Sequence, residues 1–332
     1  MEINIIKNKI LDKEDLDENE TLFLFEKIMS GELNEIEITC VLIGLKLKNE
    51  SKNEIIGAAK IMREKSLKIT SPSNTVDTCG TGGDMKNTLN ISTCASLVAA
   101  SAGATVAKHG NRSVSSKSGS ADMLEKLGYK ITSEIKDLEN SLLENNFCFL
   151  FAQNHHSAMK HVINVRKSLA TRTIFNLLGP LTNPANAKNQ LLGVFEKKLV
   201  NTHCEALKEL GSLNAMVVHG EDGLDEISLT SNTIVAELKD NKIKEYIFNP
   251  TDYGYNYIKI EDIKGGDAEF NAKSFINMLE GNFATFQKIV EINAGAALYL
   301  GKITKDLKEG FSLAKKVIEE GQANNFVKKL IK

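Results

Sequence analysis

The sequence predicts an α/β protein: a small all-helical N-terminal domain, then a larger α/β domain with a mostly parallel central sheet and C-terminal helices. Three observations predict this class. Residues 1–67 carry helical patterns without a strand pattern, short apolar strands alternate with helices from about residue 73, and the C-terminus returns to helices. Strands that alternate with helices in this way form a parallel sheet covered on both faces. The 332 residues suffice for one large domain or two ordinary ones.

The helical segment comes first. In "TLFLFEKIM" and "EITCVLIGLKL" the apolar residues recur at the spacing of one helix face. Ser51 and Glu54 have the spacing of a capping box, which predicts that the helix "EIIGAAKIMREKS" begins there.

The alternating segment follows. "TVDT", "TVAKHG", "FCFLFA", "QLLGVF" and "NAMVVHG" are predicted strands, and "ISTCASLVAASAG", "SADMLEKLG" and "LENSLLENN" are predicted helices. Another helix lies between the last two of these strands. The stretch "EISLTSNTIVAELKDNKIKEYIF" is typical of antiparallel strands. We therefore expect a mostly parallel sheet, followed in the chain by antiparallel strands.

Composition narrows the classes of partner and the compartment. The net charge of −2 provides no global basic field for nucleic acid or an anionic membrane. No apolar run is long enough for a membrane span, and the acidic N-terminus lacks a secretory pattern. The five cysteines lie far apart without a C-x-x-C pair, which is unlike a disulfide framework or a zinc ribbon. We expect a reduced, cytoplasmic protein.

The stretch "DTCGTGGD" places Gly80, Gly82 and Gly83 between a predicted strand and a predicted helix. Such a loop lets backbone N–H groups approach phosphate, and the helix N-terminus adds a favourable dipole. It is not a Walker A loop, because no Gly-Lys-Ser/Thr follows. A tight turn that needs positive φ is the alternative.

The next stretch, "NTLNIST", supplies the polar side chains of Thr88, Asn90, Ser92 and Thr93 at the predicted helix start. These side chains suit a polyphosphate and a metal ion that it carries. Helix capping is the alternative, and the two roles can coexist.

The segment "AKHGNRSVSSKSGSAD" is the richest in polar side chains, and it follows a predicted strand. Loops beyond the carboxyl ends of strands bind ligands in α/β sheets. Only four of the chain's 41 basic residues are arginine, and Arg112 is one of them. Because arginine offers a planar fork that lysine lacks, its use here favours a binding loop over a solvated serine loop.

The segment "QNHHSAMKHVINVRKSLATRTIFNLLGPLTNP" contains His155, His156, His161, Arg166 and Arg172. The histidines lack carboxylate or cysteine support, so capping or packing is favoured over metal binding. The two arginines are six residues apart and are expected to point in different directions on one helix. Arg166 could bind a planar carboxylate bidentately, whereas Arg172 could tie down the "GPLTNP" connection.

The stretch "HGEDGLDEIS" carries the adjacent acids Asp225 and Glu226 after a predicted strand. An isolated pair of this kind would be an acidic surface turn. If the loop faces the glycine loop, the two carboxylates become hard oxygen ligands for Mg²⁺.

Together these segments resemble the anthranilate phosphoribosyltransferases, a family in the nucleoside-phosphorylase-like class. The matching motifs are "GTGGD", "NIST", "KHGNRSVSS-x-SGSAD-x-LE-x-LG", "HH-x-AMKHV-x2-VR", "RTIFNLLGPLTNPA" and "GLDEIS", in the family's order from about residue 75 to 230. The chain departs from the family at Ser157 and Asn164, where proline is usual, and at Ala170, where glycine is usual.

The resemblance implies transfer of the 5-phosphoribosyl group from 5-phospho-α-D-ribose 1-diphosphate (PRPP) to the amino group of anthranilate, a step of tryptophan biosynthesis. It implies a helical domain over residues 1–70, completed by helices from about 160–188, and a PRPP-binding α/β domain over residues 71–332. It also implies about two Mg²⁺ ions per site and a homodimer formed through the helical domain. Nucleic acid and membrane partners are not expected.

The resemblance also implies the site residues. Anthranilate contacts would be Gly80, Asn111 and Arg166, metal ligands would be Ser92, Asp225 and Glu226, and His109 is a candidate acceptor of the amine proton. PRPP contacts would be Gly80, Gly83, Asp84, Thr88, Asn90, Ile91, Ser92, Thr93, Lys108, His109, Gly110, Asn111, Arg112, Ser113, Val114, Ser115, Ser116 and Ser120.

An aromatic amine is neutral at pH 7 and needs no strong base, so the absence of an evident nucleophile–base pair fits this reaction. We expect an oxocarbenium-like transition state with inversion at C1. A pyrimidine nucleoside phosphorylase is the nearest alternative, but it would need no acidic Mg²⁺ pair. A non-catalytic relative that binds nucleic acid is the other, and the slight net acidity weighs against it.

Overall fold

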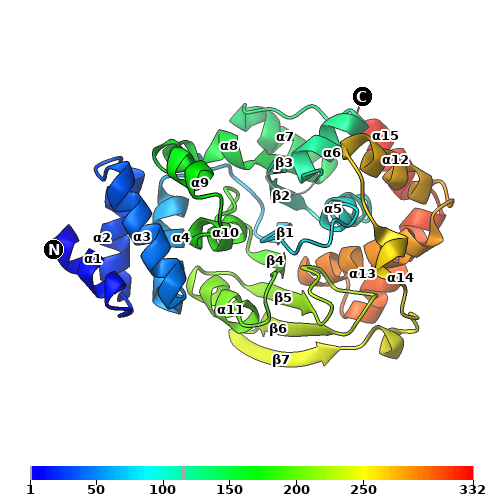
Figure 1. Cartoon of the computed structure of the whole chain (residues 1–332). Coiled ribbons are helices and arrows are strands. Elements are labelled where there is room, and N and C mark those ends of the chain that lie inside the picture. Colours follow the sequence, from blue (N-terminus) through cyan, green and yellow to red (C-terminus); the bar gives the residue numbers. More distant parts are fainter. Residues whose placement is uncertain (1, 114–116, 332) are drawn as a thin grey trace.

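Seven strands form one sheet in the order β3-β2-β1-β4-β5-β6-β7, and helices cover both of its faces (Figure 1). The structure is a computed structural model that describes residues 2–113 and 117–331. Strands β1 to β5 are parallel, β6 pairs antiparallel with β5, and β7 pairs antiparallel with β6. The antiparallel pairing of β6 and β7 confirms the prediction for this stretch, and the structure places both strands at one edge of the same sheet. The strands are β1 (Val76–Gly80), β2 (Val106–Gly110), β3 (Phe147–Phe151), β4 (Asn189–Gly193), β5 (Asn214–Gly220), β6 (Thr233–Lys239) and β7 (Lys242–Phe248).

The central strands are buried because helices cover both faces of the sheet, and β3 is apolar throughout. In β3, Phe147 and Phe149 belong to the hydrophobic core on one face, and Cys148 and Leu150 belong to a smaller core on the other. This alternation follows from the two-residue period of a strand.

Four helices form the N-terminal part of the chain, at the left of Figure 1. Capping boxes at Asp17, Asn34 and Ser51 begin the last three of them, which confirms the box predicted at Ser51. Apolar residues of α9 and α10, including Val165 and Phe175, join the same hydrophobic core. The helices are α1 (Ile3–Leu11), α2 (Glu18–Met29), α3 (Glu35–Lys48), α4 (Lys52–Glu64), α9 (Ile163–Leu169) and α10 (Ile174–Leu178).

Helices of the larger part cover the sheet. Helix α11 lies over β5 and β6 on one face, whereas α5 and α13 lie over the other. These helices are α5 (Ile91–Ser101), α6 (Ser120–Leu127), α7 (Ile135–Asn145), α8 (Ala152–His155), α11 (Leu199–Glu209), α12 (Ala268–Leu279), α13 (Ala284–Leu300), α14 (Leu307–Glu319) and α15 (Gln322–Leu330). In the described part of the chain, no helix combines the length and hydrophobicity needed to cross a membrane.

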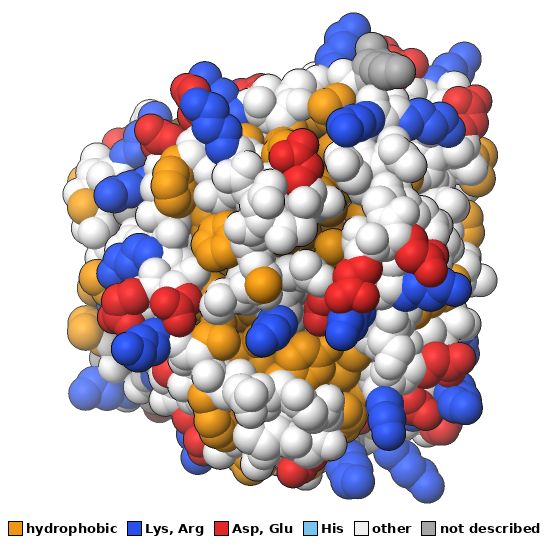
Figure 2. Space-filling view, turned by 90° about the vertical axis from the view of Figure 1, so that its right-hand side faces the viewer, with side chains coloured by type: hydrophobic (Ala, Val, Ile, Leu, Met, Phe, Trp, Pro, Cys, Tyr) orange, Lys and Arg blue, Asp and Glu red, His pale blue; other side chains and the backbone are white. Residues whose placement is uncertain are grey.

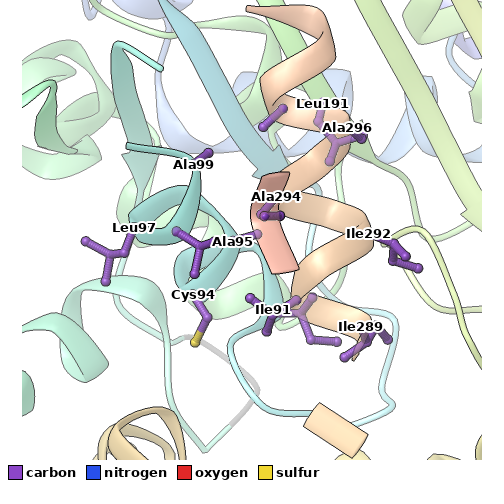
Figure 3. Close-up of a cluster of buried hydrophobic side chains, with 14 of the residues drawn as sticks. Ile91, Cys94, Ala95, Leu97, Ala99, Leu191, Ile289, Ile292, Ala294 and Ala296 are labelled. Atoms are coloured by element: carbon purple, nitrogen blue, oxygen red, sulfur yellow. The ribbon is translucent and has the colours of Figure 1, made fainter. Parts of the chain in front are cut away.

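Helices α5 and α13 pack closely because small residues line their contact. Ala95 of α5 and Ala294 of α13 lie between the two helices (Figure 3). Gly295 of α13 likewise faces Gly310 of α14, and a Cβ on Gly310 would lie 2.3 Å from the Gly295 carbonyl oxygen. This packing fixes the position of the α5 N-terminus, which begins directly after the glycine loop.

Candidate active site

Four of the parallel strands end in glycine at the same edge of the sheet, at Gly80, Gly110, Gly193 and Gly220. In the register of β1 and β4, Gly80 lies opposite Gly193. The strand order reverses at this pair, since β2 and β3 lie on one side and β5 on the other. Parallel α/β sheets form their ligand crevice at this point of reversal, so the geometry marks this edge as the site.

Asp225 occupies the crevice between the ends of β1 and β4. A Cβ on Gly80 would lie 2.7 Å from its Oδ2, and a Cβ on Gly193 would lie 1.5 Å from its carbonyl oxygen. Neither position has room for a side chain, which explains both glycines. The N–H of Gly82 donates to Asp225 Oδ2 at 2.9 Å. The structure therefore brings the glycine loop and the acidic loop into direct contact.

Glu226 is held against the start of α5. Its Oε1 accepts the N–H of Ser92 at 3.0 Å. The following residue, Ile227, is gripped by Asn293 of α13, whose Oδ1 accepts the Ile227 N–H and whose Nδ2 donates to the Ile227 carbonyl, each at 3.0 Å. Sequence reasoning missed Asn293, because nothing in the pattern of α13 distinguishes it from other buried helix residues.

The acids at this edge raise one another's pKa. Burial, followed by the charge of Asp84, raises the pKa of Asp225 to about 7. Burial and the charge of Asp225 raise the pKa of Glu226 well above its usual range, and burial also raises that of Asp84. Like charges held together in a buried place favour a bound cation.

The oxygen ligands at this edge suit a hard cation whose remaining ligands are phosphate and water. Among residues 2–113 and 117–331, no three His, Cys, Asp or Glu side chains are grouped as a metal site. The chain offers two carboxylates and the Ser92 hydroxyl, and Mg²⁺ characteristically binds through one or two carboxylates plus phosphate and water. Asp222 is not available, because its carboxylate accepts bonds from Leu224, Ser228 and Thr230.

Lys108 lies beside the start of α5 and is almost fully buried. Its Nζ donates to the Thr78 carbonyl at 2.5 Å and lies 3.5 Å from Ser92 Oγ. The buried Asp77 is a second charge close to it: burial raises the pKa of Asp77 to about 6, and Lys108 opposes that shift. Sequence reasoning did not assign Asp77.

The glycine loop has left-handed backbone at Gly82, Gly83, Met85 and Asn87. The loop is therefore a tight turn that needs positive φ, as the alternative proposed. It also contacts the acidic loop, so the two descriptions hold together. A β-bridge joins Thr88 to Lys264 and fixes the far end of the loop.

The loop after β2 is tied to the start of α5. Asn90 Nδ2 donates to the Ser118 carbonyl at 3.2 Å, and Thr93 Oγ1 donates to Ser120 Oγ at 3.1 Å. Of the predicted PRPP contacts, Val114, Ser115 and Ser116 lie outside the described residues.

Arg112 is paired within its own segment. Its guanidinium donates to Glu125 at 2.6 and 2.7 Å and to Asp122 at 3.0 Å. These partners raise its pKa, so the guanidinium stays charged. The neighbouring Asn111 is exposed, and its Oδ1 accepts from Gln153 Nε2 at 3.4 Å.

His109 is buried beside His156, with ring centroids 5.3 Å apart. Its Nδ1 lies 3.1 Å from the Gly179 carbonyl oxygen, and its Nε2 has no partner among the described residues. Burial lowers its pKa well below the usual value, so the ring is neutral. The ring therefore has an unprotonated nitrogen, but its lowered pKa makes it a weak base.

Arg166 of α9 lies with its guanidinium 5.6 Å from the centre of the Phe175 ring. It forms no ion pair with a described carboxylate, and burial lowers its pKa. Within the described chain no hydrogen bond joins it to Gly80 or Asn111, the other two predicted anthranilate contacts. An arginine that is partly buried without an internal partner is available to an anionic ligand.

Arg172 differs from the prediction in two ways. It lies between α9 and α10, not on one helix with Arg166, because α9 ends at Leu169. Its Nη2 donates to the carbonyl of Gly83, so it holds the glycine loop. The "GPLTNP" connection is instead held by Arg63, whose Nε donates to the Leu181 carbonyl at 2.6 Å.

Comparison with known proteins agrees with this geometry. Residues 5–66 match the helical bundle domain of a glycosyl transferase family, and residues 72–324 match its α/β domain. The anthranilate phosphoribosyltransferase of Thermoanaerobacter sp. (strain X514) is 50% identical over 316 residues, which cover 95% of this chain and 94% of that protein.

Solved structures agree as well. The anthranilate phosphoribosyltransferase of Thermus thermophilus superposes with a TM-score of 0.91 at 38% identity, covering 98% of both chains. The enzyme of Saccharomyces cerevisiae in complex with PRPP and Mg superposes with a TM-score of 0.89 at 26% identity, covering 99% of this chain and 96% of that one.

Proposed function

This chain belongs to the anthranilate phosphoribosyltransferases of the glycosyl transferase family, and we propose that its reaction takes place in the crevice between β1 and β4. The reaction transfers the 5-phosphoribosyl group of PRPP to the amino group of anthranilate, releases pyrophosphate and serves tryptophan biosynthesis. One observation supports this location above the others: Asp225 accepts the Gly82 N–H and so joins the glycine loop to the acidic loop.

PRPP is proposed to bind along the glycine loop, the α5 N-terminus and the loop after β2. Backbone N–H groups at a helix start attract phosphate, and the hydroxyls around them add further donors. Ser92 and Thr93 lie within the first turn of α5, next to the acidic pair. The proposed contacts are Gly80, Gly83, Asp84, Thr88, Asn90, Ile91, Ser92, Thr93, Lys108, His109, Gly110, Asn111, Arg112, Ser113, Val114, Ser115, Ser116 and Ser120.

Mg²⁺ is proposed to bind Ser92, Asp225 and Glu226, with about two ions per site. When bound, Mg²⁺ stabilises the charge of the departing pyrophosphate. The raised pKa values of the two carboxylates support this assignment, because a nearby cation would relieve their mutual repulsion. A complex with PRPP and Mg is known for the yeast relative.

Anthranilate is proposed to meet Arg166 through its carboxylate, with Gly80 and Asn111 as the other contacts. The guanidinium has the planar geometry that binds a carboxylate bidentately. Its lack of a carboxylate partner among the described residues supports this role.

The residues then act mainly by positioning and charge stabilisation. Arg166 and Asn111 hold the amine nitrogen in line with C1 of the ribose. Loop N–H groups stabilise pyrophosphate as the C1–O bond breaks, through an oxocarbenium-like transition state with inversion at C1. His109 is the candidate acceptor of the amine proton, which it would take late in the reaction.

We also propose a domain division, a homodimer and a cytoplasmic location. Residues 1–70, with helices from about 160–188, are proposed as a helical domain, and residues 71–332 as the PRPP-binding domain. The helical domain is proposed to form a homodimer, because α3 exposes Ile36 and Leu47 to 82% and 70%. A cytoplasmic location is supported by the five cysteines, which all lie in the described residues as free thiols.

The direct test follows the fluorescence of anthranilate in the presence of the purified chain. Adding PRPP and Mg²⁺ together should abolish the fluorescence, whereas either one alone should leave it unchanged. Persistent fluorescence at saturating PRPP and Mg²⁺ would refute the proposed activity.

The two alternatives have separate tests. A pyrimidine nucleoside phosphorylase would cleave thymidine or uridine in phosphate buffer, and we expect no cleavage. A nucleic-acid-binding relative would bind DNA in a salt-dependent way. Figure 2 shows basic and acidic side chains intermixed on the face of the C-terminal helices, with no broad area of positive charge there.

A further inference from the structure

Arg172 is the residue that holds the middle of the glycine loop. Its Nη2 donates to the carbonyl of Gly83. The same guanidinium stacks on Phe195, with its Cζ 4.0 Å from the ring centroid. A cation centred this closely over an aromatic face is held in place by the ring as well as by the hydrogen bond.

Gly83 suits this position because its backbone is left-handed and lies against the Arg172 guanidinium. Its φ is +76°, and a Cβ there would lie 2.9 Å from Arg172 Nη2 and 3.1 Å from Nε. The backbone of the loop therefore runs directly across the guanidinium, without an intervening side chain.

Phe195 secures the loop at a second point. Its N–H donates to Thr81 Oγ1 at 3.2 Å, and the Thr81 N–H donates to the Gly193 carbonyl at 2.9 Å. The start of the loop is thus attached to the end of β4, and Arg172 continues that attachment to Gly83.

Arg172 also connects the loop to the helical part of the chain. It lies in the short link, residues 170–173, between α9, which carries Arg166, and α10. The preceding residue, Thr171, accepts a hydrogen bond from Lys46 Nζ of α3. The link is therefore bound on one side by the N-terminal helices and on the other by the glycine loop.

We propose that Arg172 is a positioning residue for PRPP. In a planar trans peptide, the C=O of Gly83 and the N–H of Asp84 point in opposite directions. By binding the carbonyl, Arg172 turns its negative end away from an anionic ligand and leaves the Asp84 N–H as a donor on the other side. Because Arg172 lies on the link that follows α9, the placement of the helical part is coupled to the shape of the phosphate loop. This inference rests on the proposed binding of PRPP at the glycine loop.

The test compares steady-state kinetics of Arg172→Ala with those of the wild-type enzyme. Loss of a charge-assisted hydrogen bond predicts that the KM for PRPP rises about tenfold or more, while the KM for anthranilate stays within about twofold. A structural role alone would not separate the two KM values. Equal rises in both, or no rise in the KM for PRPP, would overturn the proposal.

Three further variants make the test decisive. Arg172→Lys keeps the charge but loses the planar fork, so its KM for PRPP should lie between wild type and alanine; a wild-type value would overturn the proposal. Phe195→Leu should raise the same KM, and the double variant should be no worse than Arg172→Ala alone, since the two residues act together. Additive effects would contradict this coupling. Ser92→Ala checks the site itself: if it leaves PRPP binding and the Mg²⁺ response unchanged, the proposed PRPP site fails independently of Arg172.

Discussion

The role proposed for Arg166 rests on a missing contact: no carboxylate of the described chain pairs with its guanidinium. It is charged, half-buried and stacked near Phe175, but no described carboxylate pairs with it. Burial without a partner is unfavourable for a guanidinium, so the arrangement is explained if the substrate supplies the carboxylate.

We expect Arg166→Ala to raise the KM for anthranilate about 10- to 100-fold, because a charge-assisted pair contributes roughly 1.5–3 kcal/mol. The KM for PRPP should be nearly unchanged. Initial rates measured against each substrate check this, with Lys167→Ala as the control, since Lys167 is an exposed basic neighbour on the same helix. Equal damage to both substrates would contradict the assignment.

A second prediction at the scale of single residues concerns the acidic pair, Asp225 and Glu226. Replacing both carboxylates, Asp225→Asn with Glu226→Gln, should lower kcat and raise the Mg²⁺ concentration needed for half-maximal activity. Glu221→Gln is the matched control, because Glu221 is exposed in the same loop. A Mg²⁺ titration identical to wild type would show that the pair holds the loops together but does not bind the metal.

The same double variant has a measurable effect on stability without metal. Burial raises the pKa of Asp225 to about 7, so its ionisation in the folded state opposes folding as pH rises from about 4 toward 7. The double variant has uncharged side chains at both positions, so it does not lose stability through this ionisation. In Mg²⁺-free urea unfolding, the variant should therefore gain stability relative to wild type at pH 8 but not at pH 4.

At the scale of elements, α9 ends in a conformation that its sequence does not favour. Ala170 has φ 47° and ψ 30°, the left-handed C-cap geometry for which glycine is the usual residue. The strand ends show the opposite case, since Gly80 and Gly193 stand where Asp225 leaves no room for a Cβ. Alanine thus stands where the backbone favours glycine, and glycine stands where a neighbouring loop excludes a side chain.

We expect Ala170→Gly to stabilise the protein by about 0.5–1 kcal/mol, because relief of left-handed strain exceeds the extra chain entropy of glycine. Ala268→Gly, in the first turn of α12, should instead be destabilising. The midpoints of urea unfolding compare the two. A loss of stability for Ala170→Gly would show that the neighbouring contacts of the link matter more than φ.

At the scale of the whole molecule, the N-terminal helices leave an apolar surface uncovered. Ile36 and Leu47 of α3 are 82% and 70% exposed, and Leu47 follows Ile36 by eleven positions. Eleven residues make about three turns, so both side chains lie on one face of α3. A second copy of the chain would cover this face in the proposed homodimer.

Ile36→Glu with Leu47→Glu should weaken self-association at least about tenfold, because each change places a charge where an apolar side chain would be buried. Sedimentation equilibrium measures the effect. The control is Leu143→Glu on α7, where a 68% exposed leucine is removed from another surface. Wild-type association in the double variant would place the interface elsewhere.

The fold class, the antiparallel strands after the parallel ones and the family could all be predicted from the amino-acid sequence. Each of these follows from local patterns: apolar periods, glycine and capping signals, and short motifs in a fixed order. Local patterns also singled out the glycine loop, Asp225 and Glu226 as candidates, but not whether they meet.

Which side chains come together could be learned only from the folded chain. Asp225 reaches Gly82 because the strand order reverses between β1 and β4, and no local pattern specifies that order. Asn293 holds Ile227, and Arg172 holds Gly83, across 66 and 89 residues of sequence. Contacts over such separations depend on how the helices pack against the sheet, which is set by the whole core at once. Local patterns therefore identify the candidate groups, and long-range packing assigns each group its neighbours.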